Sequence, residues 1–343
     1  MKILAVGDPH FMFDYPYANR IPDRRRAERA LVLSTIHRES KDCDAVVLMG
    51  DNLDKRHNHS SAIKEFVEFL HGFGDKRIHI ISGNHETFEG NKTALDFLIG
   101  INPWWSVYTP AGFEAGVSHF VTPNYQIGLI PYMTNSSLGA SSKEEARDKL
   151  MLAIEKYKYD VLFVHHMVSG TTGFEGANEI VLPRERLEAV ATLVVAGHIH
   201  EEAVKGRTIL TGNIFTHDVG QTERSILKID TEDDTYSRIA LPVRPIYKLF
   251  NPTIEALDAL PANSIIRTIL TDKGQDVEAI KESLKRFDAS LFVEQYPNER
   301  ERLHVDKGQT LDLSIPALID MYAKAKKKNP ERLKKAFVLV NES

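Results

Sequence analysis

The sequence predicts an α/β protein whose strands deliver polar residues to one edge of a sheet. Apolar runs of strand length recur along the chain, most of them close with a glycine, and an Asp, Asn or His follows each. Such runs are typical of buried parallel strands, and chemistry in open α/β sheets collects at the carboxyl ends of these strands. We therefore expect one polar rim. The runs and the residues after them are 2–7 with Asp8 and His10, 44–50 with Asp51, 78–83 with Asn84 and His85, 161–164 with His165, and 193–197 with His198 and His200.

Helices are expected between these strands. Apolar residues such as Phe66 and Leu70 recur at helical spacing in 60–73, so this helix covers the sheet in a βαβ crossover. The segment 107–132 alternates and contains Gly and Pro, which indicates shorter strands. The other expected helices are 24–40, 93–99, 144–157 and 184–190, and antiparallel strands are expected at 209–213, 225–229 and 236–240.

The expected helix 24–40 combines an apolar face with a cluster of arginines. Arginines at a helix start oppose the helix dipole, which prefers anions there. Because charge runs are usually solvated faces, we interpret the cluster as a solvated helix end and keep a phosphate contact as the alternative. The expected buried face is Ala27, Ala30, Leu31, Leu33, Ser34 and His37, and the arginines are Arg24, Arg25, Arg26 and Arg29.

Three prolines, Pro242, Pro245 and Pro252, predict a boundary between domains. The chain has 343 residues, which is long enough for more than one domain. The expected parts are a first domain of 1–250 that carries the polar rim, a small βαβ domain of 253–310, and a helical tail of 311–343.

The two smaller parts carry no cluster of ligand residues. In 253–310 we expect strands at 264–270 and 289–295 around an amphipathic helix at 277–287. The tail, 311–343, is the most basic part of the chain and has apolar positions as well. It either packs on the main body or docks on a partner helix.

Composition limits the class of protein. The formal charge of -5 is unlike that of a generally basic nucleic-acid binder, so any DNA contact must come from local patches or from metal ions. A single cysteine, Cys43, fits a reducing compartment, and we expect the cytoplasm. The N-terminal apolar run is too short for a signal peptide, and no apolar stretch approaches the roughly 20 residues of a membrane span.

The polar rim has the chemistry of a metal centre. Carboxylate, imidazole and amide groups without cysteine suit Mn²⁺, Fe²⁺ or Zn²⁺ better than Ca²⁺ or structural zinc. Six or seven ligands exceed one tetrahedral shell and imply two ions, with Asp51 as the natural bridge. Two ions about 3.5–4 Å apart can bind both the attacking and the leaving oxygen of a phosphoester. We expect Mn²⁺ as the first choice, with Mg²⁺, Fe²⁺ and Zn²⁺ as alternatives.

Five short motifs occur in order along residues 1–215. They are Asp8-x-His10, Gly50-Asp51, Gly83-Asn84-His85-Glu86, His165 and Gly197-His198-x-His200. In this order they resemble the motifs of the calcineurin-like metallophosphoesterases. The resemblance implies a four-layer β-sandwich flanked by helices and a metal-dependent phosphoester hydrolase.

The resemblance also implies a role for each polar residue. By it, Asp8, His10, Asp51 and His200 would hold one ion, and Asp51, Asn84, His165 and His198 the other. His85 would orient the phosphate and protonate the leaving oxygen, which suits an imidazole at neutral pH. His166 is the alternative to His165. Near the rim, Asp54 would order a ligand histidine, and Lys55 and Arg56 would either contact phosphates or be plain surface charges.

Within this superfamily the chain most resembles the SbcD-type nucleases of DNA recombination and double-strand-break repair, in their compact phage-like form. The strings that carry this are the opening Met-Lys-Ile-Leu, Gly50-Asp51-x-x-Asp54-x-Arg56, 126–133 and Arg244-Pro245-Ile246-Tyr247. The resemblance implies an exonuclease or endonuclease on DNA, a cap at 253–310 that helps hold DNA, and a tail at 311–343 that binds an SbcC-type SMC ATPase. We also expect a homodimer.

Other functions remain open alternatives. A protein serine/threonine phosphatase shares Gly-Asp-x-x-Asp-x-Arg and Gly-Asn-His-Glu, but such enzymes have Gly where this chain has Phe11 and lack the Gly-His-x-His ending. A small-molecule phosphodiesterase would make the residues after 252 merely structural. A non-catalytic scaffold for an ATPase is disfavoured, because it would have no need of every ligand.

Overall fold

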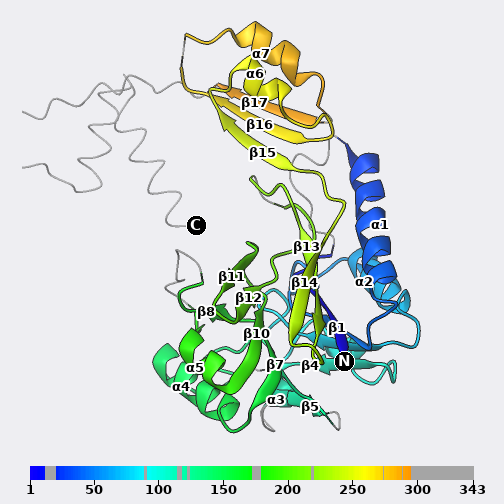
Figure 1. The fold of residues 1–343 in the computed structure, drawn as a ribbon, viewed down its shortest axis with the longest axis vertical. Helices are drawn as coiled ribbons and strands as arrows, with labels where there is room; N and C mark the ends of the chain where they lie inside the picture. The colour runs from blue at the N-terminus through cyan, green and yellow to red at the C-terminus, as the bar shows by residue number, and fades with distance from the viewer. Residues whose placement is uncertain are drawn as a thin grey trace, which may run out of the picture. The chain divides into compact units, whose positions relative to one another are not determined.

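Two six-stranded sheets form the centre of the protein in the computed structural model (Figure 1). The structure describes residues 1–11, 21–88, 91–113, 118–121, 124–171, 179–217, 220–272, 274–287 and 289–294. The first sheet has the order β14-β13-β1-β2-β3-β4, and the second has the order β11-β12-β10-β7-β6-β5. Strands β1 to β4 are mutually parallel, as are β6, β7, β10 and β12.

The strands of the first sheet are β1 Lys2–Val6, β2 Ala45–Leu48, β3 Arg77–Ile81, β4 Trp105–Tyr108, β13 Ser225–Asp230 and β14 Thr235–Ala240. Those of the second are β5 Ser118–Val121, β6 Gln126–Ile130, β7 Tyr159–Val164, β10 Ala191–Ala196, β11 Ala203–Lys205 and β12 Thr208–Leu210. A separate pair consists of β8 Met167–Val168 and β9 Val181–Leu182. The helices of this part are α1 Pro22–Glu39, α2 Ser60–His71, α3 Pro110–Phe113, α4 Lys143–Ile154 and α5 Arg184–Val190.

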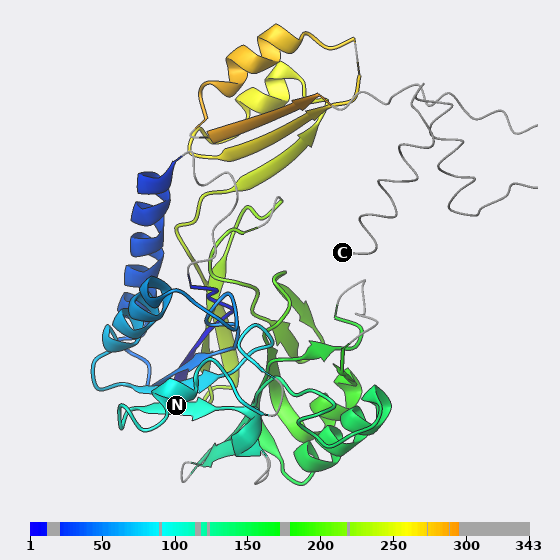
Figure 2. The same ribbon diagram turned by 180° about the vertical axis from the view of Figure 1, so that it is seen from behind.

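Side-chain alternation along the strands produces four layers. Successive residues of a strand face opposite sides, and in β1 Ile3 and Ala5 pack between the two sheets while Leu4 and Val6 pack toward α1 and α2. The outer face of the second sheet packs in the same way against α4 and α5, the green helices of Figure 2. Both faces of the central strands of each sheet are therefore buried, which explains the continuous apolar runs and confirms the expected α/β sandwich flanked by helices.

Helix α1 buries a different face from the one expected. Its buried residues are Arg25, Glu28, Arg29, Val32, Thr35 and Ile36, whereas Ala27, Ala30 and Leu31 are exposed. Arg25 donates to Glu28 Oε2 at 2.8 Å and to the carbonyl of Thr216 at 3.1 Å. The interpretation of these arginines as a solvated end is wrong for Arg25 and Arg29, because protein oxygens take the place of water. Arg25 has the Glu28 carboxylate and the Thr216 carbonyl, and Arg29 Nη2 lies 3.3 Å from Glu65 Oε1.

Removing the Glu28 carboxylate should destabilise the fold strongly. Glu28 also accepts from the backbone N–H of Arg244 at 2.7 Å, so Glu28→Ala leaves the buried Arg25 and the partly buried Arg244 without their carboxylate. Breaking a buried pair typically costs about 3–5 kcal/mol, and urea unfolding followed by circular dichroism would measure the loss. The matched control is Asp23→Ala, since the Asp23–Arg26 pair on the same helix is 91% and 79% exposed and should contribute nothing measurable.

The expected helix at 93–99 is only a short 3₁₀ turn, η2 Asp96–Leu98. The side chain of Asp96 accepts from both the backbone and the hydroxyl of Thr93, at 3.2 and 2.8 Å. Because these side-chain hydrogen bonds compete with helical backbone bonds, the segment forms a turn instead of a helix.

A third sheet carries the segment after the sandwich. Its strands, all parallel, are β15 Ile246–Phe250, β16 Ile265–Leu270 and β17 Ala289–Glu294, and helices α6 Ile254–Asp258 and α7 Val277–Leu284 pack on one face. The unit is therefore βαβαβ, one strand and one helix larger than the expected βαβ, and β15 precedes residue 253. Thr253 and Asp276 cap the two helices, each accepting from a backbone N–H three residues on. We call this part the cap sheet. The predicted tail, 311–343, lies outside the described residues.

Candidate metal centre

The residues that follow five parallel strands converge at one place. Asp8 and His10 follow β1, Asp51 follows β2, Asn84 follows β3, His165 follows β7, and His198 and His200 follow β10. Three groups of described side chains have ligand atoms within 4.8 Å of one another; one of them, His10, Asp54 and His85, includes two residues not predicted as ligands, and the other two consist of predicted ligands. Of these two, one is Asp8, His10, Asp51 and His200, the other is Asp51, His165 and His198, and Asp51 belongs to both.

The first group holds neutral imidazoles beside buried carboxylates. The Nε2 atoms of His10 and His200 lie 2.9 Å apart. Burial lowers the pKa of His10 to about 3, so its ring is neutral at physiological pH. Burial and the nearby charge of Asp51 raise the pKa of Asp8, whose Oδ2 accepts from the His198 backbone while Oδ1 has no donor among the described residues. A cation at this point would interact with Asp8 Oδ1, which has no described donor, and would offset the repulsion between the carboxylates of Asp8 and Asp51.

The second group is built from atoms that can only accept. His165 Nδ1 lies 2.6 Å from the Met49 carbonyl, which fixes its proton there and leaves a lone pair on Nε2. That Nε2 faces Asn84 Oδ1 at 3.1 Å and Asp51 Oδ2 at 3.4 Å. Three acceptors without a hydrogen between them fit a metal ion. The residues present therefore suit the two-metal site that the sequence predicts.

Glu179 fixes the second histidine of this group. His198 Nε2 donates to Glu179 Oε2 at 2.7 Å, so the lone pair on Nδ1 faces Asn84 Oδ1 at 2.8 Å. A carboxylate behind a ligand histidine orients the ring and raises its basicity. Sequence reasoning missed Glu179, because it precedes the short strand β9 and no motif marks it.

Loss of Glu179 should weaken metal binding without unfolding the protein. Glu179→Ala leaves His198 free to adopt the other tautomer, and loss of such a partner typically costs about 10–100-fold in metal affinity. Isothermal titration calorimetry with Mn²⁺ would measure it. Glu179→Gln keeps an oxygen that accepts from Nε2 and should restore much of the affinity. Equal losses in both variants would contradict this role.

Glycines before the ligands let the backbone turn tightly. Asp51 has φ +45° and Gly50 before it has φ +108°, a region that favours glycine. A Cβ at Gly50 would overlap the His165 ring, and one at Gly83 would overlap Asp51. The Gly-Asp and Gly-Asn pairs are therefore packing requirements of the centre.

His85 lies beside the centre with one nitrogen exposed. Its Nδ1 donates to the Asp54 carbonyl at 2.6 Å, and its Nε2 lies 4.0 Å from Asp51 Oδ2. The side chain is 38% exposed, far more than that of His165, which is fully buried. An imidazole anchored at one nitrogen and open at the other can pass a proton to a substrate oxygen.

Asp54 and its neighbours lie along one side of the centre. Besides holding His85 by its carbonyl, Asp54 has a carboxylate oxygen 3.8 Å from His10 Nδ1. Lys55 is exposed and 3.8 Å from the same carboxylate. Arg56 lines a cleft of about 490 Å³ next to the centre. Asn84, Thr87, Phe88, Tyr132, Met133, Thr134, Asn135, Ser136 and Ile180 also line it.

Two further histidines border the ligands. His166 Nε2 accepts from the Met133 backbone at 3.0 Å, so its ring faces away from Asp51 and the structure groups His165 instead. His217 is buried with its ring centroid 5.7 Å from that of His10, and its Nδ1 accepts from Asn213 Nδ2 at 3.2 Å. No role was expected for His217, since it lies outside the motifs.

Two acceptor clusters that share one carboxylate, at the strand ends of an α/β sandwich, define a dinuclear metal-dependent phosphoester hydrolase. The chain belongs to the calcineurin-like phosphoesterase family, whose model matches residues 1–202. No curated protein sequence matches the chain.

Solved structures give weak likenesses. A novel archaeal phosphodiesterase is 17% identical over 70% of this chain and 100% of its own, with a TM-score of 0.35. The protein TT1561 of Thermus thermophilus is 13% identical over 70% and 98%, with a TM-score of 0.41. The D62A mutant of Vps29 from Entamoeba histolytica is 14% identical over 70% and 99%, with a TM-score of 0.30.

Among the described residues, none of the helices has the length and apolarity needed to cross a bilayer.

Proposed function

We propose that the protein is a two-metal DNA nuclease of the SbcD type, acting in DNA recombination and double-strand-break repair. The metal centre supports phosphoester hydrolysis. The strings around Asp51 and Arg244 support the SbcD-type assignment. The ions, with Mn²⁺ as first choice, would be held by the two groups that share Asp51, and when bound they would supply Lewis-acid activation of water and of the phosphate.

The observation that favours a nucleotide substrate is the cleft beside Asn84. Phe88 and Tyr132 supply aromatic surfaces, Arg56 supplies a cation, and Thr134 and Ser136 supply hydroxyls. Aromatic and arginine surfaces of this kind stack bases and pair with phosphates. Its volume of about 490 Å³ falls within the about 300–1,000 Å³ typical of ligand sites.

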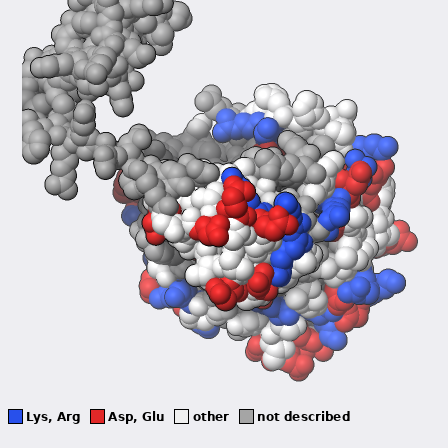
Figure 3. Space-filling view, turned by 90° about the horizontal axis from the view of Figure 1, so that it is seen from above, with Lys and Arg blue, Asp and Glu red and all other residues white. Residues whose placement is uncertain are grey.

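The surface charge is consistent with local rather than global recognition of DNA. On the face shown in Figure 3, basic and acidic side chains are interspersed. The net charge of -5 agrees with this mixture. The proposed contact with DNA therefore depends on metal ions and on the cleft.

Residues of the centre and of the cleft have roles in holding the phosphate and in protonating the leaving oxygen. When protonated at both nitrogens, His85 would orient a phosphate oxygen through Nε2–H and give that proton to the leaving oxygen, which returns the ring to the neutral form with Nδ1–H still donating to the Asp54 carbonyl. Asn84 and Arg56 border the space where the scissile phosphate and the adjoining nucleotide would lie. Burial raises the pKa of Tyr132 to about 12, so its ring offers a neutral wall.

A substrate panel tests the proposal. Linear double-stranded DNA, single-stranded DNA, cyclic nucleotides and a phosphopeptide would be incubated with Mn²⁺ and the wild-type protein or His85→Ala at matched metal occupancy. Degradation of DNA alone, lost in the variant, is expected. Turnover of the phosphopeptide or of cyclic nucleotides with DNA intact would contradict the proposal and favour a phosphatase or a small-molecule phosphodiesterase.

Partners belong to the same proposal. We propose that residues 311–343 bind an SbcC-type SMC ATPase and that the protein is a homodimer. Exposed apolar side chains near η2, namely Phe97, Ile99, Ile101 and Trp104, support a contact between copies. Sedimentation velocity of the wild type and of Ile101→Glu would test the dimer, and a monomeric wild type would contradict it.

A further inference from the structure

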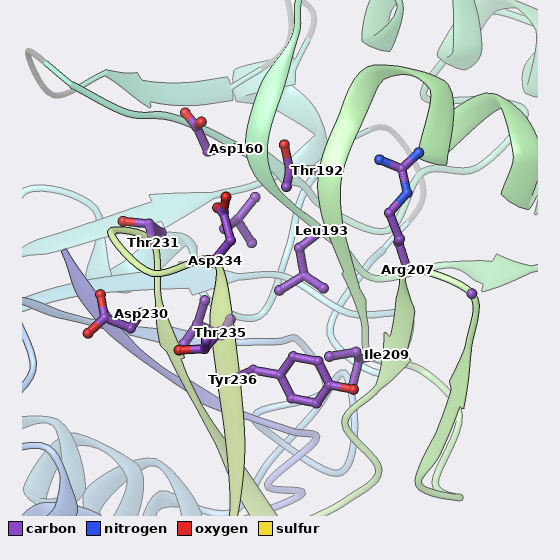
Figure 4. A pocket seen from close by; sticks show the side chains of 13 residues that line it. Asp160, Thr192, Leu193, Arg207, Ile209, Asp230, Thr231, Asp234, Thr235 and Tyr236 are labelled. Atoms are coloured by element: carbon purple, nitrogen blue, oxygen red, sulfur yellow. The ribbon is translucent and has the colours of Figure 1, made fainter.

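A second cavity lies at the end of the sandwich away from the metal centre. It has a volume of about 250 Å³ and is lined from both sheets (Figure 4). Thr192 and Leu193 at its wall begin β10, whereas His198 follows the end of that strand. Leu193 is three residues before Ala196, so at about 3.3 Å per residue it lies about 10 Å before the end of β10, after which the loop to His198 begins. The cavity is therefore distinct from the proposed active site.

The floor of this distal cavity is apolar. Val161, Ile209 and Ile229 line it and are each at most 2% exposed. The ring of Tyr236, which is 43% exposed, is directed toward Ile209 in Figure 4. An apolar stem that entered the cavity would cover this ring and displace water from it.

The rim of the cavity is acidic. Asp160, Asp230 and Asp234 contribute three carboxylates, and Arg207 is the one basic residue among the described residues that line the cavity. Asp160 Oδ2 accepts from the Gln126 backbone at 2.7 Å, and Asp230 lies 3.9 Å from the N-terminal ammonium group, so Asp234 and the second oxygen of Asp160 face a cation most directly. Arg207 is already engaged, because its guanidinium donates to the carbonyl of Glu188. The rim therefore complements a cation carried on an apolar stem, the chemistry of an arginine or lysine side chain.

The strand beside the cavity is an open edge. Within the described part of the chain, β14 pairs with β13 and ends the first sheet. Its one charged residue, Arg238, is turned inward, with Nη1 2.9 Å from Glu202 Oε2 and Nη2 2.7 Å from the Leu210 carbonyl. Edge strands usually carry charges or prolines that prevent pairing with another chain, and β14 presents neither at its outer edge.

From these two features we propose that β14 and the distal cavity together bind an extended peptide of a partner protein. The peptide would add a strand beside β14 and insert one arginine or lysine between Tyr236 and the carboxylates of Asp160 and Asp234. Backbone hydrogen bonds supply affinity in such strand addition, and the pocket supplies specificity. A cavity of about 250 Å³ is smaller than a typical site for a drug-sized ligand, about 300–1,000 Å³, and suits one side chain.

Synthetic peptides test the proposal on the full chain. The panel is acetyl-Thr-Val-X-Val-Thr-amide with X as arginine, lysine, citrulline or glutamate, and binding is followed by calorimetry and by hydrogen exchange of the β14 amides. The arginine and lysine peptides are expected to bind and to protect β14. Citrulline keeps the shape and removes the charge, and should weaken binding about tenfold or more, which equals about 1.4 kcal/mol.

A matched pair of variants locates the binding. Asp234 lines the cavity and has φ +50°, a conformation that asparagine tolerates, so Asp234→Asn removes the charge with little strain. It should weaken the arginine peptide about fivefold to tenfold, whereas Asp233→Asn, one residue away and outside the cavity, should change it less than about twofold. An arginine peptide with N-methylated backbone amides should lose protection of β14.

Clear results would overturn the proposal. These are no binding by the arginine and lysine peptides, equal binding by the citrulline peptide, or equal effects of the two aspartate variants. Protection of β14 by a second copy of the chain in the absence of peptide, seen as dependence on protein concentration, would also overturn it. Hydrolysis by the metal centre is not used as a readout, so failure here would leave the proposed nuclease function untouched.

Discussion

Replacing His85 by alanine is expected to slow hydrolysis by about 10²–10⁴-fold, the usual contribution of a general acid. The hydrogen bond that this residue makes with the proposed ligands is through its backbone, whose N–H donates to Asp51 Oδ1 at 2.9 Å. That bond survives in alanine, so Mn²⁺ binding should be unchanged. Single-turnover rates on DNA at saturating Mn²⁺, with metal binding measured separately by calorimetry, would check both parts.

The control for His85 is another histidine of the same region. His59 is exposed and directly precedes α2, and it has no ligand or acid role in this structure. His59→Ala should retain the wild-type rate. If His85→Ala lost metal in proportion to activity, the imidazole would be a ligand and its assignment as proton donor would be wrong.

Replacing Asp51 by asparagine is expected to abolish the metal response altogether. Among the described residues, Asp51 is the one shared by the two groups of proposed ligands. Metal at 100 times its Kd should stabilise the wild type by about 2.7 kcal/mol. The variant should gain almost no stability from the metal. Loss of a residue that only hydrogen-bonds to a metal ligand costs about 10–100-fold in activity, and the loss of activity in Asp51→Asn should be larger than that. Thermal unfolding with and without Mn²⁺ would measure the first effect.

Without metal, the same substitution should not weaken the fold. Two buried carboxylates repel each other, and the charge of Asp51 is one of the causes that raise the pKa of Asp8. Asparagine removes that repulsion, but against the effect of burial the histidines around Asp51 hold the pKa of its own carboxyl below the usual range, so its charge also has favourable contacts. The two effects oppose each other, and the metal-free variant should unfold near the wild-type temperature. Asp148→Asn, at an exposed position of α4, serves as the control and should keep the full metal response. A metal-free Asp51→Asn that unfolded well below the wild type would contradict this account.

Most of the sandwich could be predicted because its strands are buried on both faces. Continuous apolar runs located β1, β2, β3, β7 and β10 to within two residues, and the helix 184–190 was predicted with its observed bounds. Helix α1 shows the limit of the method. Apolarity marked Ala27 and Leu31, but the buried face holds Arg25 and Glu28, and only the fold reveals partners such as Thr216, 191 residues away from Arg25 in sequence.

The same limit applies to the metal centre. Each proposed ligand follows a strand, so a local pattern was enough to predict all seven, and the structure brings the carboxylates and imidazoles among them into two groups. Glu179 and His217 follow no such pattern. Their proximity to the ligands depends on loops that return to the rim from elsewhere in the chain, which no spacing in the sequence encodes.

The position of β15 determines where this chain can be divided. Ile246 pairs with Ile265 of β16, and its backbone also bonds to Gly220 and Gln221 of the sandwich. A chimera in which another domain replaced everything after residue 253 would keep β15 but remove β16, so that β15 would have no strand to pair with. The segment between Leu241 and Ile246 is the suitable place for a domain exchange. A chimera joined there would replace the whole cap sheet and keep the phosphoesterase sandwich intact.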